Sequence, residues 1–393
     1  SSVSVGRNPT DAMPSADRVI RTGITLGAGA NALDVNVTSA RLTGAVTLDG
    51  AALLRTLTSA QVPSYTQSYV YLLARDTGVR HLVAAPNYSY TSSAYALQSG
   101  TDLVAASVVP GTYDLVYSHN VGSSGSVGRN PTDAMPSGDR VIRTGVTLTA
   151  GANTLDVALT TARITGTVTL DGAALPRTLT SAQVPSYTQS YVYLLSRDTH
   201  VRHLIAAPNY SYTSSAYALQ SGTDLVAASV PPGTYDLVYS HNVGSSVSVG
   251  RNPTDAMPSA DRVIRTGITL GAGANALDVN VTSARLTGAV TLDGAALLRT
   301  LTSAQVPSYT QSYVYLLARD TGVRHLVAAP NYSYTSSAYA LQSGTDLVAA
   351  SVVPGTYDLV YSHNVGSSGS VGRNPTDAMP SADRVLRACV SVP

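Results

Sequence analysis

Apolar and polar residues alternate with a period of two over short stretches of this chain, and turn-forming residues separate the stretches. Over residues 41–48, every second position from Leu42 to Leu48 is apolar or glycine, which places these residues on one face of a strand. Asp49 and Gly50 follow directly, a pair typical of tight hairpin turns. The 3.6-residue period of an amphipathic helix is missing, so the pattern predicts β-strands joined by turns.

One complete unit of this pattern predicts seven or eight strands. In the strand at residues 68–74, residues 69–74 carry apolar or tyrosine side chains on both faces, so both faces should contact protein. Residues 86–93 are expected to form a loop or an irregular edge. The predicted strands are residues 41–48, 68–74, 79–85, 95–97, 101–108, 112–118, 139–148 and 154–159. Seven or eight such strands, with turns every 8 to 12 residues or so, are typical of an antiparallel β-sandwich.

The whole pattern repeats with a period of 122 residues. The string GRNPTDAMPS begins at Gly6, Gly128, Gly250 and Gly372. Residues 1–122 and 245–366 are identical, and the middle copy differs from them at about fifteen positions. The repeat divides the chain into closing strands of a preceding repeat at residues 1–39, complete sandwiches at 40–161 and 162–283, and a sandwich lacking its last strand at 284–393.

Neighbouring units are joined directly. The last predicted strand of one unit ends near Leu159, and the first strand of the next begins close to Ala162. Without a glycine- or serine-rich spacer the joint has little freedom, so consecutive sandwiches are expected to form a stiff rod.

Composition excludes several classes of function. All 24 cationic residues are arginine and all 23 acidic residues are aspartate, which leaves a net charge of +1. So small a charge provides no field to attract nucleic acid. No stretch approaches 18 consecutive apolar residues, so the sequence predicts no membrane span.

The sequence predicts no enzyme, no cofactor and no metal site. Serine, histidine and aspartate occur in every unit, but the Gly-x-Ser-x-Gly elbow and the zinc and EF-hand spacings do not. His81 and His119 are expected to be surface or hydrogen-bonding residues. Cys389, the single cysteine, is either a small apolar residue in the last strand or an intermolecular contact.

Tyrosine is the only aromatic residue, with 24 copies. Tyrosine must therefore supply the aromatic part of the core, and Tyr71, Tyr113 and Tyr117 are expected there. Tyr88 and Tyr90 lie in the predicted loop and are the candidates for exposed ligand contacts, with surface glycans as the ligand.

Three segments of each unit resemble bacterial extracellular tandem repeats. They are LTGAVTLDG at residues 42–50, YVYLL at 69–73 and VPGTYDLVY at 109–117. The resemblance implies an immunoglobulin-like or transthyretin-like (carboxypeptidase regulatory-like) β-sandwich and a surface or secreted structural role, as in stalks, adhesins or fibres. It specifies the fold better than the function. Some related adhesin domains form a lysine-to-asparagine isopeptide bond, which this lysine-free chain cannot make.

The two ends of the chain are complementary. The last unit lacks the equivalent of residues 277–281, and a sandwich without an edge strand exposes unpaired backbone groups. The hypothesis is that a segment near the N-terminus completes the open sandwich of another copy and forms a head-to-tail filament. The segment comprises Ala32, Leu33, Asp34, Val35, Asn36 and Val37. In the alternative, the chain is an excerpt of a longer array.

The sequence is compatible with two functions. One is a structural subunit of an extracellular or cell-surface fibre or stalk, with the chain itself as partner. The other is a multivalent adhesin or carbohydrate-binding array, in which repeated tyrosines supply avidity.

Overall fold

The computed structural model describes residues 9–10, 12–62, 66–119, 130–184, 189–241, 254–306, 311–363 and 375–393. The four starts of the GRNPTDAMPS string lie outside these ranges. Within them every regular element is a β-strand, which confirms the all-β prediction.

The first unit contains twelve strands. They are β1 (Ala40–Leu48), β2 (Ala51–Ala52), β3 (Thr56–Leu57), β4 (Tyr69–Ala74), β5 (Arg80–Ala84), β6 (Tyr88–Tyr90), β7 (Tyr95–Leu97), β8 (Leu103–Val108), β9 (Gly111–His119), β10 (Gly138–Leu148), β11 (Gly151–Thr154) and β12 (Val157–Leu159). One sheet is centred on β1, which pairs with β8, β2, β11 and β12. The second has the order β10-β9-β4-β5, and a small third sheet the order β3-β7-β6.

Unit 2 repeats this arrangement strand for strand. Its strands are β13 (Ala162–Leu170), β14 (Ala173–Ala174), β15 (Thr178–Leu179), β16 (Tyr191–Ser196), β17 (Arg202–Ala206), β18 (Tyr210–Tyr212), β19 (Tyr217–Leu219), β20 (Leu225–Val230), β21 (Gly233–His241), β22 (Ala260–Leu270), β23 (Gly273–Ala276) and β24 (Val279–Val281). The sheet orders match those of unit 1.

Unit 3 differs from the other two along its first strand, which is interrupted. Its strands are β25 (Ala284–Ala289), β26 (Thr291–Leu292), β27 (Ala295–Ala296), β28 (Thr300–Leu301), β29 (Tyr313–Ala318), β30 (Arg324–Ala328), β31 (Tyr332–Tyr334), β32 (Tyr339–Leu341), β33 (Leu347–Val352), β34 (Gly355–His363) and β35 (Ala382–Val392). Among the described residues, β25 pairs with β33 alone.

The closing strands depart from the sequence prediction in two ways. A single antiparallel strand was expected at residues 154–159, but β11 and β12 are separate strands, and both pair in parallel with β1. The interruption falls at Leu155, whose side chain enters the core. Residues 149 and 150 carry the chain from the sheet of β10 to the sheet of β1, which sets the direction of the closing strands.

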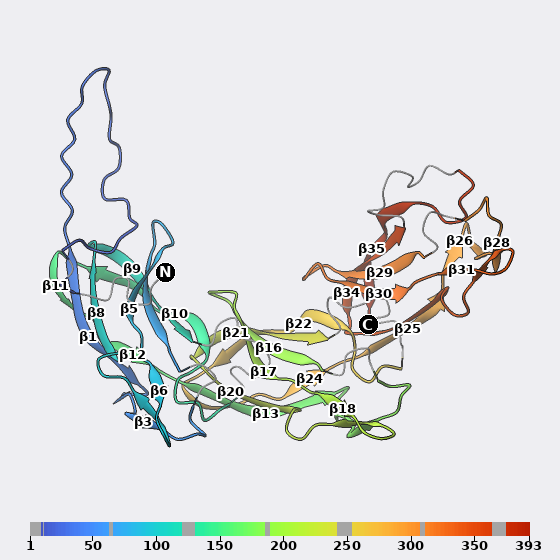
Figure 1. Cartoon of the computed structure of the whole chain (residues 1–393), viewed down its shortest axis with the longest axis horizontal. Coiled ribbons are helices and arrows are strands. Elements are labelled where there is room, and N and C mark those ends of the chain that lie inside the picture. The colour runs from blue at the N-terminus through green and yellow to red at the C-terminus, as the bar shows by residue number, and fades with distance from the viewer. Residues whose placement is uncertain are drawn as a thin grey trace.

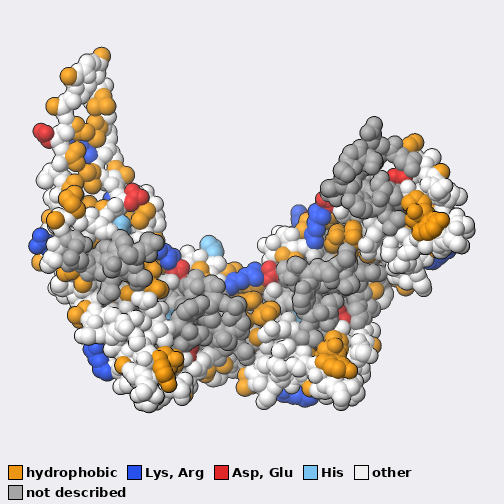
Figure 2. All heavy atoms as spheres, in the orientation of Figure 1, with side chains coloured by type: hydrophobic (Ala, Val, Ile, Leu, Met, Phe, Trp, Pro, Cys, Tyr) orange, Lys and Arg blue, Asp and Glu red, His pale blue; other side chains and the backbone are white. Residues whose placement is uncertain are grey.

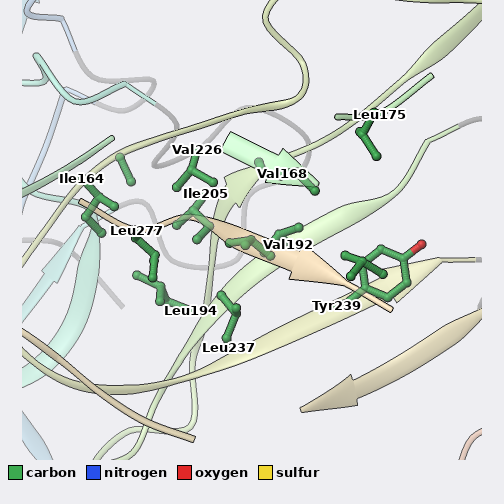
Figure 3. Packing of buried hydrophobic residues seen from close by; sticks show 14 of the residues in the cluster. Ile164, Val168, Leu175, Val192, Leu194, Ile205, Val226, Leu237, Tyr239 and Leu277 are labelled. Atoms are coloured by element: carbon green, nitrogen blue, oxygen red, sulfur yellow. The ribbon is translucent and has the colours of Figure 1, made fainter. Parts of the chain in front are cut away.

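Each unit has its own core. The first cluster runs from Ala40 to Leu159 and the third from Ala284 to Val392. The second runs from Ala162 to Val281 and adds Val353 of unit 3. In Figure 3, side chains from both sheets of unit 2 converge on this core. Apolar exchanges between copies fall inside it, as at Ile164, which takes the place of Leu42 and is likewise 0% exposed.

A backbone hydrogen bond and an arginine–tyrosine contact recur at each junction between a unit and the segment that precedes it. The Ser137 amide donates to the Ser229 carbonyl at 2.7 Å, and Gly138 lies so close to Pro231 that a Cβ would overlap the proline ring. Arg140 packs on Tyr235 with 4.8 Å between its guanidinium carbon and the ring centroid. The three units follow one another along an arc in Figure 1.

The N-terminal segment docks on unit 1 and then leaves it. The Ser15 amide donates to the Ser107 carbonyl at 2.8 Å, and Arg18 packs on Tyr113 at 4.5 Å, as Ser137 and Arg140 do one unit later. Residues 16–39 form no strand and stand away from β1 as the dark-blue loop in Figure 1. Figure 2 shows apolar side chains spread along this projection.

Candidate assembly site

A groove beside the first strand is filled in units 1 and 2 by the closing strands. β11 and β12 run parallel to β1, starting with Gly151 opposite Ala40. The inward side chains of Leu155, Val157 and Leu159 are at most 3% exposed. β23 and β24 fill the same groove beside β13. The closing strand therefore completes both a sheet and a core.

A glycine in the first strand makes room for the closing strand. A Cβ at Gly44 would overlap the carbonyl oxygen of Leu155, and one at Gly166 would overlap that of Leu277. Gly288 holds the same position in unit 3, where a Cβ would meet a valine side chain at 3.6 Å, an ordinary contact. Unit 3 thus keeps the clearance for a strand that its own described residues do not supply.

The first strand of unit 3 has an open edge. Residues 284–292 have the same sequence as β1. Nevertheless Leu286 and Val290 are only half-buried, whereas their counterparts Leu42 and Val46 are 0% and 2% exposed. Identical residues differ in burial because no closing strand lies beside them among the residues that the structure describes.

A spare closing strand lies in the N-terminal segment. Residues 29–37 have the same sequence as residues 273–281, which form β23 and β24. Leu33, Val35 and Val37 are 45%, 59% and 41% exposed, while their counterparts in unit 2 are 5%, 1% and 0% exposed. The apolar side chains that are buried beside the first strand of unit 2 are therefore exposed to solvent in the N-terminal segment.

Within one molecule the spare strand and the open edge do not meet. Residues 32–37 belong to the loop at one end of the arc, and β25 lies in the unit at the other end (Figure 1). The structure places each of the six predicted donor residues in that exposed loop, Ala32 and Asp34 included.

The two candidate tyrosines differ in exposure to solvent. Tyr88 was expected to be exposed and is 1% exposed, because the short strand β6 turns its ring into the core, where its hydroxyl donates to the Leu54 carbonyl at 2.9 Å. Burial raises its pKa to about 12. Tyr90 is 68% exposed and packs edge-on against Tyr95 at 5.2 Å between ring centroids.

Cys389 is exposed and forms no disulfide. It lies in β35 at a bulge where its φ is 56°, the left-handed region. Its sulfur lies 2.7 Å from a guanidinium nitrogen of Arg319, and its amide donates to Asp358 at 2.9 Å. The cysteine is thus part of the last strand, with its side chain facing solvent.

Six of the seven histidines are buried, and His200 is exposed. His119 Nδ1 and Ser68 Oγ are 2.8 Å apart, with both residues at most 1% exposed. Burial lowers the pKa of His119 to about 4. His81 is 5% exposed and lies 3.3 Å from the Ser15 hydroxyl. Ser68 and His119 therefore form a buried hydrogen-bonded pair.

The part of the chain that the structure describes holds neither a candidate metal cluster nor a candidate membrane-spanning helix. No group of three or more histidine, cysteine, aspartate or glutamate side chains is placed to hold a metal ion. No helix long and apolar enough to cross a bilayer is found in the same residues.

The sequence predicted an open edge in the last unit but not the residues that line it. Leu286, Gly288 and Val290 line the open edge, and nothing in their own sequence marks them, since the same letters are core residues in unit 1. The usable signal was a glycine in the middle of a strand, at Gly44, which indicates close approach of another backbone.

The fold and the site define a tandem β-sandwich array with an open sheet edge in its third unit. No protein-family model matches the chain. No curated protein matches it.

Several solved structures are similar at low identity. One is a leucine-rich repeat protein from Bacteroides thetaiotaomicron, at 14% identity over 62% of this chain and 26% of that one, with a TM-score of 0.17. Another is the Bacillus anthracis TIE protein, at 8% identity over 83% and 46%, with a TM-score of 0.18. A third is a C-terminally truncated tip fimbrial protein from Porphyromonas gingivalis, at 10% identity over 51% and 78%, with a TM-score of 0.19.

The chain spans about a quarter of the first of these proteins and just under half of the second. TM-scores this low say nothing of what this chain does.

Proposed function

We propose that the chain is a structural subunit of an extracellular or cell-surface fibre, and that copies join head to tail by strand complementation. Residues 29–37 of one copy pair in parallel with β25 of another and complete its third unit. One observation carries the proposal: the same nine-residue segment is buried beside β13 and exposed in the N-terminal loop, while β25 lacks it.

The joint would resemble the inside of unit 2. Leu33, Val35 and Val37 would leave solvent, and burying each such side chain contributes about 1.5–3 kcal/mol. The backbone of β25 would gain the hydrogen bonds that β13 makes with β23 and β24. Because the joint reuses an intramolecular arrangement, successive copies would continue the same array.

The proposal names the chain itself as partner and needs no cofactor. Neither nucleic acid nor a membrane has a role in it, and the fibre stands outside the cell.

The test changes the spare strand and leaves the three units intact. Leu33→Asp with Val35→Asp places charges in the proposed groove, while both residues are exposed in the single copy. The variant should stay monomeric in sedimentation and form no fibres under the electron microscope, whereas the unchanged chain assembles. Asn36→Ala is the matched control, because unit 1 carries Ala158 at this position and closes normally. A monomeric unchanged chain, or fibres from the charged variant, contradicts the proposal.

An adhesin is the second candidate, and the exposed tyrosine pairs favour it. Tyr90, Tyr212 and Tyr334 are 67–68% exposed, and each packs edge-on against a second tyrosine at 5.2 Å. A protruding aromatic face suits stacking on a sugar ring. Changing all three residues to alanine should abolish glycan binding by an adhesin and leave a fibre's assembly unchanged.

A further inference from the structure

We propose that at each joint residues 16–26 of the incoming copy displace β35 of the receiving copy, so that the joint forms by strand exchange. This inference rests on the proposed function and names the strand that must leave. Residues 16–26 read ADRVIRTGITL, and β35 reads ADRVLRACVSV. Both are counterparts of β22, which pairs with β21 and leads through residues 271 and 272 into the closing strands of unit 2.

At the C-terminal end of residues 16–26, this segment and β35 cannot both fit beside β34. In unit 1 two residues separate the end of β10 from the start of β11, and residues 27 and 28 take their place in the incoming segment. Three residue steps span at most about 11 Å. Once Gly29 lies beside Ala284, Leu26 must therefore lie where Val392 ends β35.

The other end of the segment is held on its own unit. Arg18 packs on Tyr113, and the Ser15 amide is bonded to Ser107. In unit 1 the corresponding path, from the junction to β11, is covered by β10 as an extended strand. Ten extended residues have no slack for a detour around β35. The incoming segment must take the path along β34.

β35 is weaker than its counterparts at its bulge. Gly145 and Gly267 have φ of 70° there, a region that glycine enters freely, but Cys389 is held at 56° with a side chain. The arginine that braces the bulge is diverted as well. Arg319 lies 3.4 Å from Asp358 and contacts the cysteine sulfur, whereas the equivalent pair in unit 1 is 2.6 Å apart.

β35 is also less buried at its start. The Asp139 and Asp261 side chains are 6% and 11% exposed because the following unit covers them, while the Asp383 side chain is 32% exposed. Exchange would bring in Gly23 for Cys389 and a strand whose start is already docked on the incoming unit. The third unit would then gain both its closing strand and a junction like the other two.

A disulfide that pins β35 tests the exchange. Thr356 and Ser391 are paired across β34 and β35, and both are exposed. Thr356→Cys with Ser391→Cys, in a Cys389→Ser background, should cut the assembly rate at least tenfold when oxidised and recover when reduced. The matched control pins β10 to β9 in unit 1 through Thr112→Cys with Thr147→Cys and should assemble in both states.

The outcomes separate the two proposals. If the oxidised β35-pinned chain assembles as fast as the reduced one, the closing strand adds without displacement; exchange is wrong and the fibre proposal stands. If the unchanged chain does not assemble, the fibre proposal itself fails.

Two further measurements, on fibres of the unchanged chain and on a single-residue variant, test the exchange even if the disulfide-pinned variant folds poorly. In fibres of the unchanged chain, amide hydrogen exchange should be fast over residues 382–392 and slow over residues 16–26, the reverse of the single copy. Protection of residues 382–392 in the fibre overturns the exchange. Cys389→Gly relieves the bulge and should slow assembly about fivefold, equivalent to about 1 kcal/mol at 1.36 kcal/mol per tenfold. An unchanged rate contradicts the exchange.

Discussion

Arg140, at the start of β10, lies across the junction from Tyr235 in β21, with its guanidinium carbon 4.8 Å from the ring centroid. Its side chain is 13% exposed and also lies 3.3 Å from Asp198. Gly233 allows this approach, because a Cβ there would overlap the guanidinium. The Pro-Gly-Thr-Tyr segment at the start of β21 therefore binds the arginine of the preceding unit.

Arg140→Ala should loosen the junction between units 1 and 2. A partly buried cation over an aromatic ring contributes about 1–2 kcal/mol, and the arginine stem adds packing. We expect a lower urea midpoint and a broader distribution of overall dimensions in small-angle X-ray scattering. Arg143→Ala, at an exposed position on the same strand, is the control and should change neither quantity. Equal behaviour of the two variants would show that the stacked arginine does not hold the units together.

The bulge in β22 should require glycine. Gly267 has a φ of 70°, and its amide donates to Asp236 at 2.8 Å. Gly267→Ala should lower the stability of unit 2 by about 1 kcal/mol, because a side chain disfavours this backbone region. Gly271→Ala is the control, since a Cβ there meets nothing within 4 Å. Equal urea midpoints for the two variants would contradict the requirement.

Local patterns predicted most strands and some turns. Residues 95–97 form β7 as predicted, and Asp49 and Gly50 have φ of 49° and 82°, the paired positive values of a type I′ turn. These features depend on residues close together in the chain, and the alternation of apolar positions records them. The exposure of residues 32–37 also follows from the sequence, because the groove that would bury this segment belongs to another unit.

Long-range pairing could not be predicted in the same way. The closing strand could have paired in either direction beside β1, since parallel and antiparallel neighbours bury the same face. The burial of Tyr88 depends on the Leu54 carbonyl, 34 positions earlier in the chain. The weakness of β35 depends on the residues that surround this strand, so its own amino-acid sequence could not predict that weakness.

The tyrosines of β6 should differ in their effect on stability. Tyr88→Phe removes a buried hydroxyl that donates to a carbonyl and should cost about 1 kcal/mol in the urea unfolding of unit 1. Tyr90→Phe changes an exposed ring and should be neutral. A neutral Tyr88→Phe would mean that the hydroxyl bond contributes nothing net.

Acid should destabilise the array through its buried histidines. Burial lowers the pKa of His119, His203, His325 and His363 to about 4 and that of His241 to about 3. In the unfolded chain these groups bind protons near pH 6.5, so their contribution to stability is complete above that value and is lost as the pH falls toward 4. Asp133 acts in the opposite direction, because burial raises its pKa to about 7 and favours the folded state as the pH falls.

The five histidines outweigh the single aspartate, so the urea midpoint should fall between pH 7 and pH 5. One fully buried histidine contributes at most about 1.4 kcal/mol per pH unit in this window. His241→Gln should keep a partner for Ser190, which lies 2.8 Å from the ring nitrogen, and should flatten the pH dependence of unit 2. His200→Asn, at an exposed turn position, should leave the slope as it is in the unchanged chain. A midpoint that is constant or rises over this interval would mean that these histidines accept protons inside the fold.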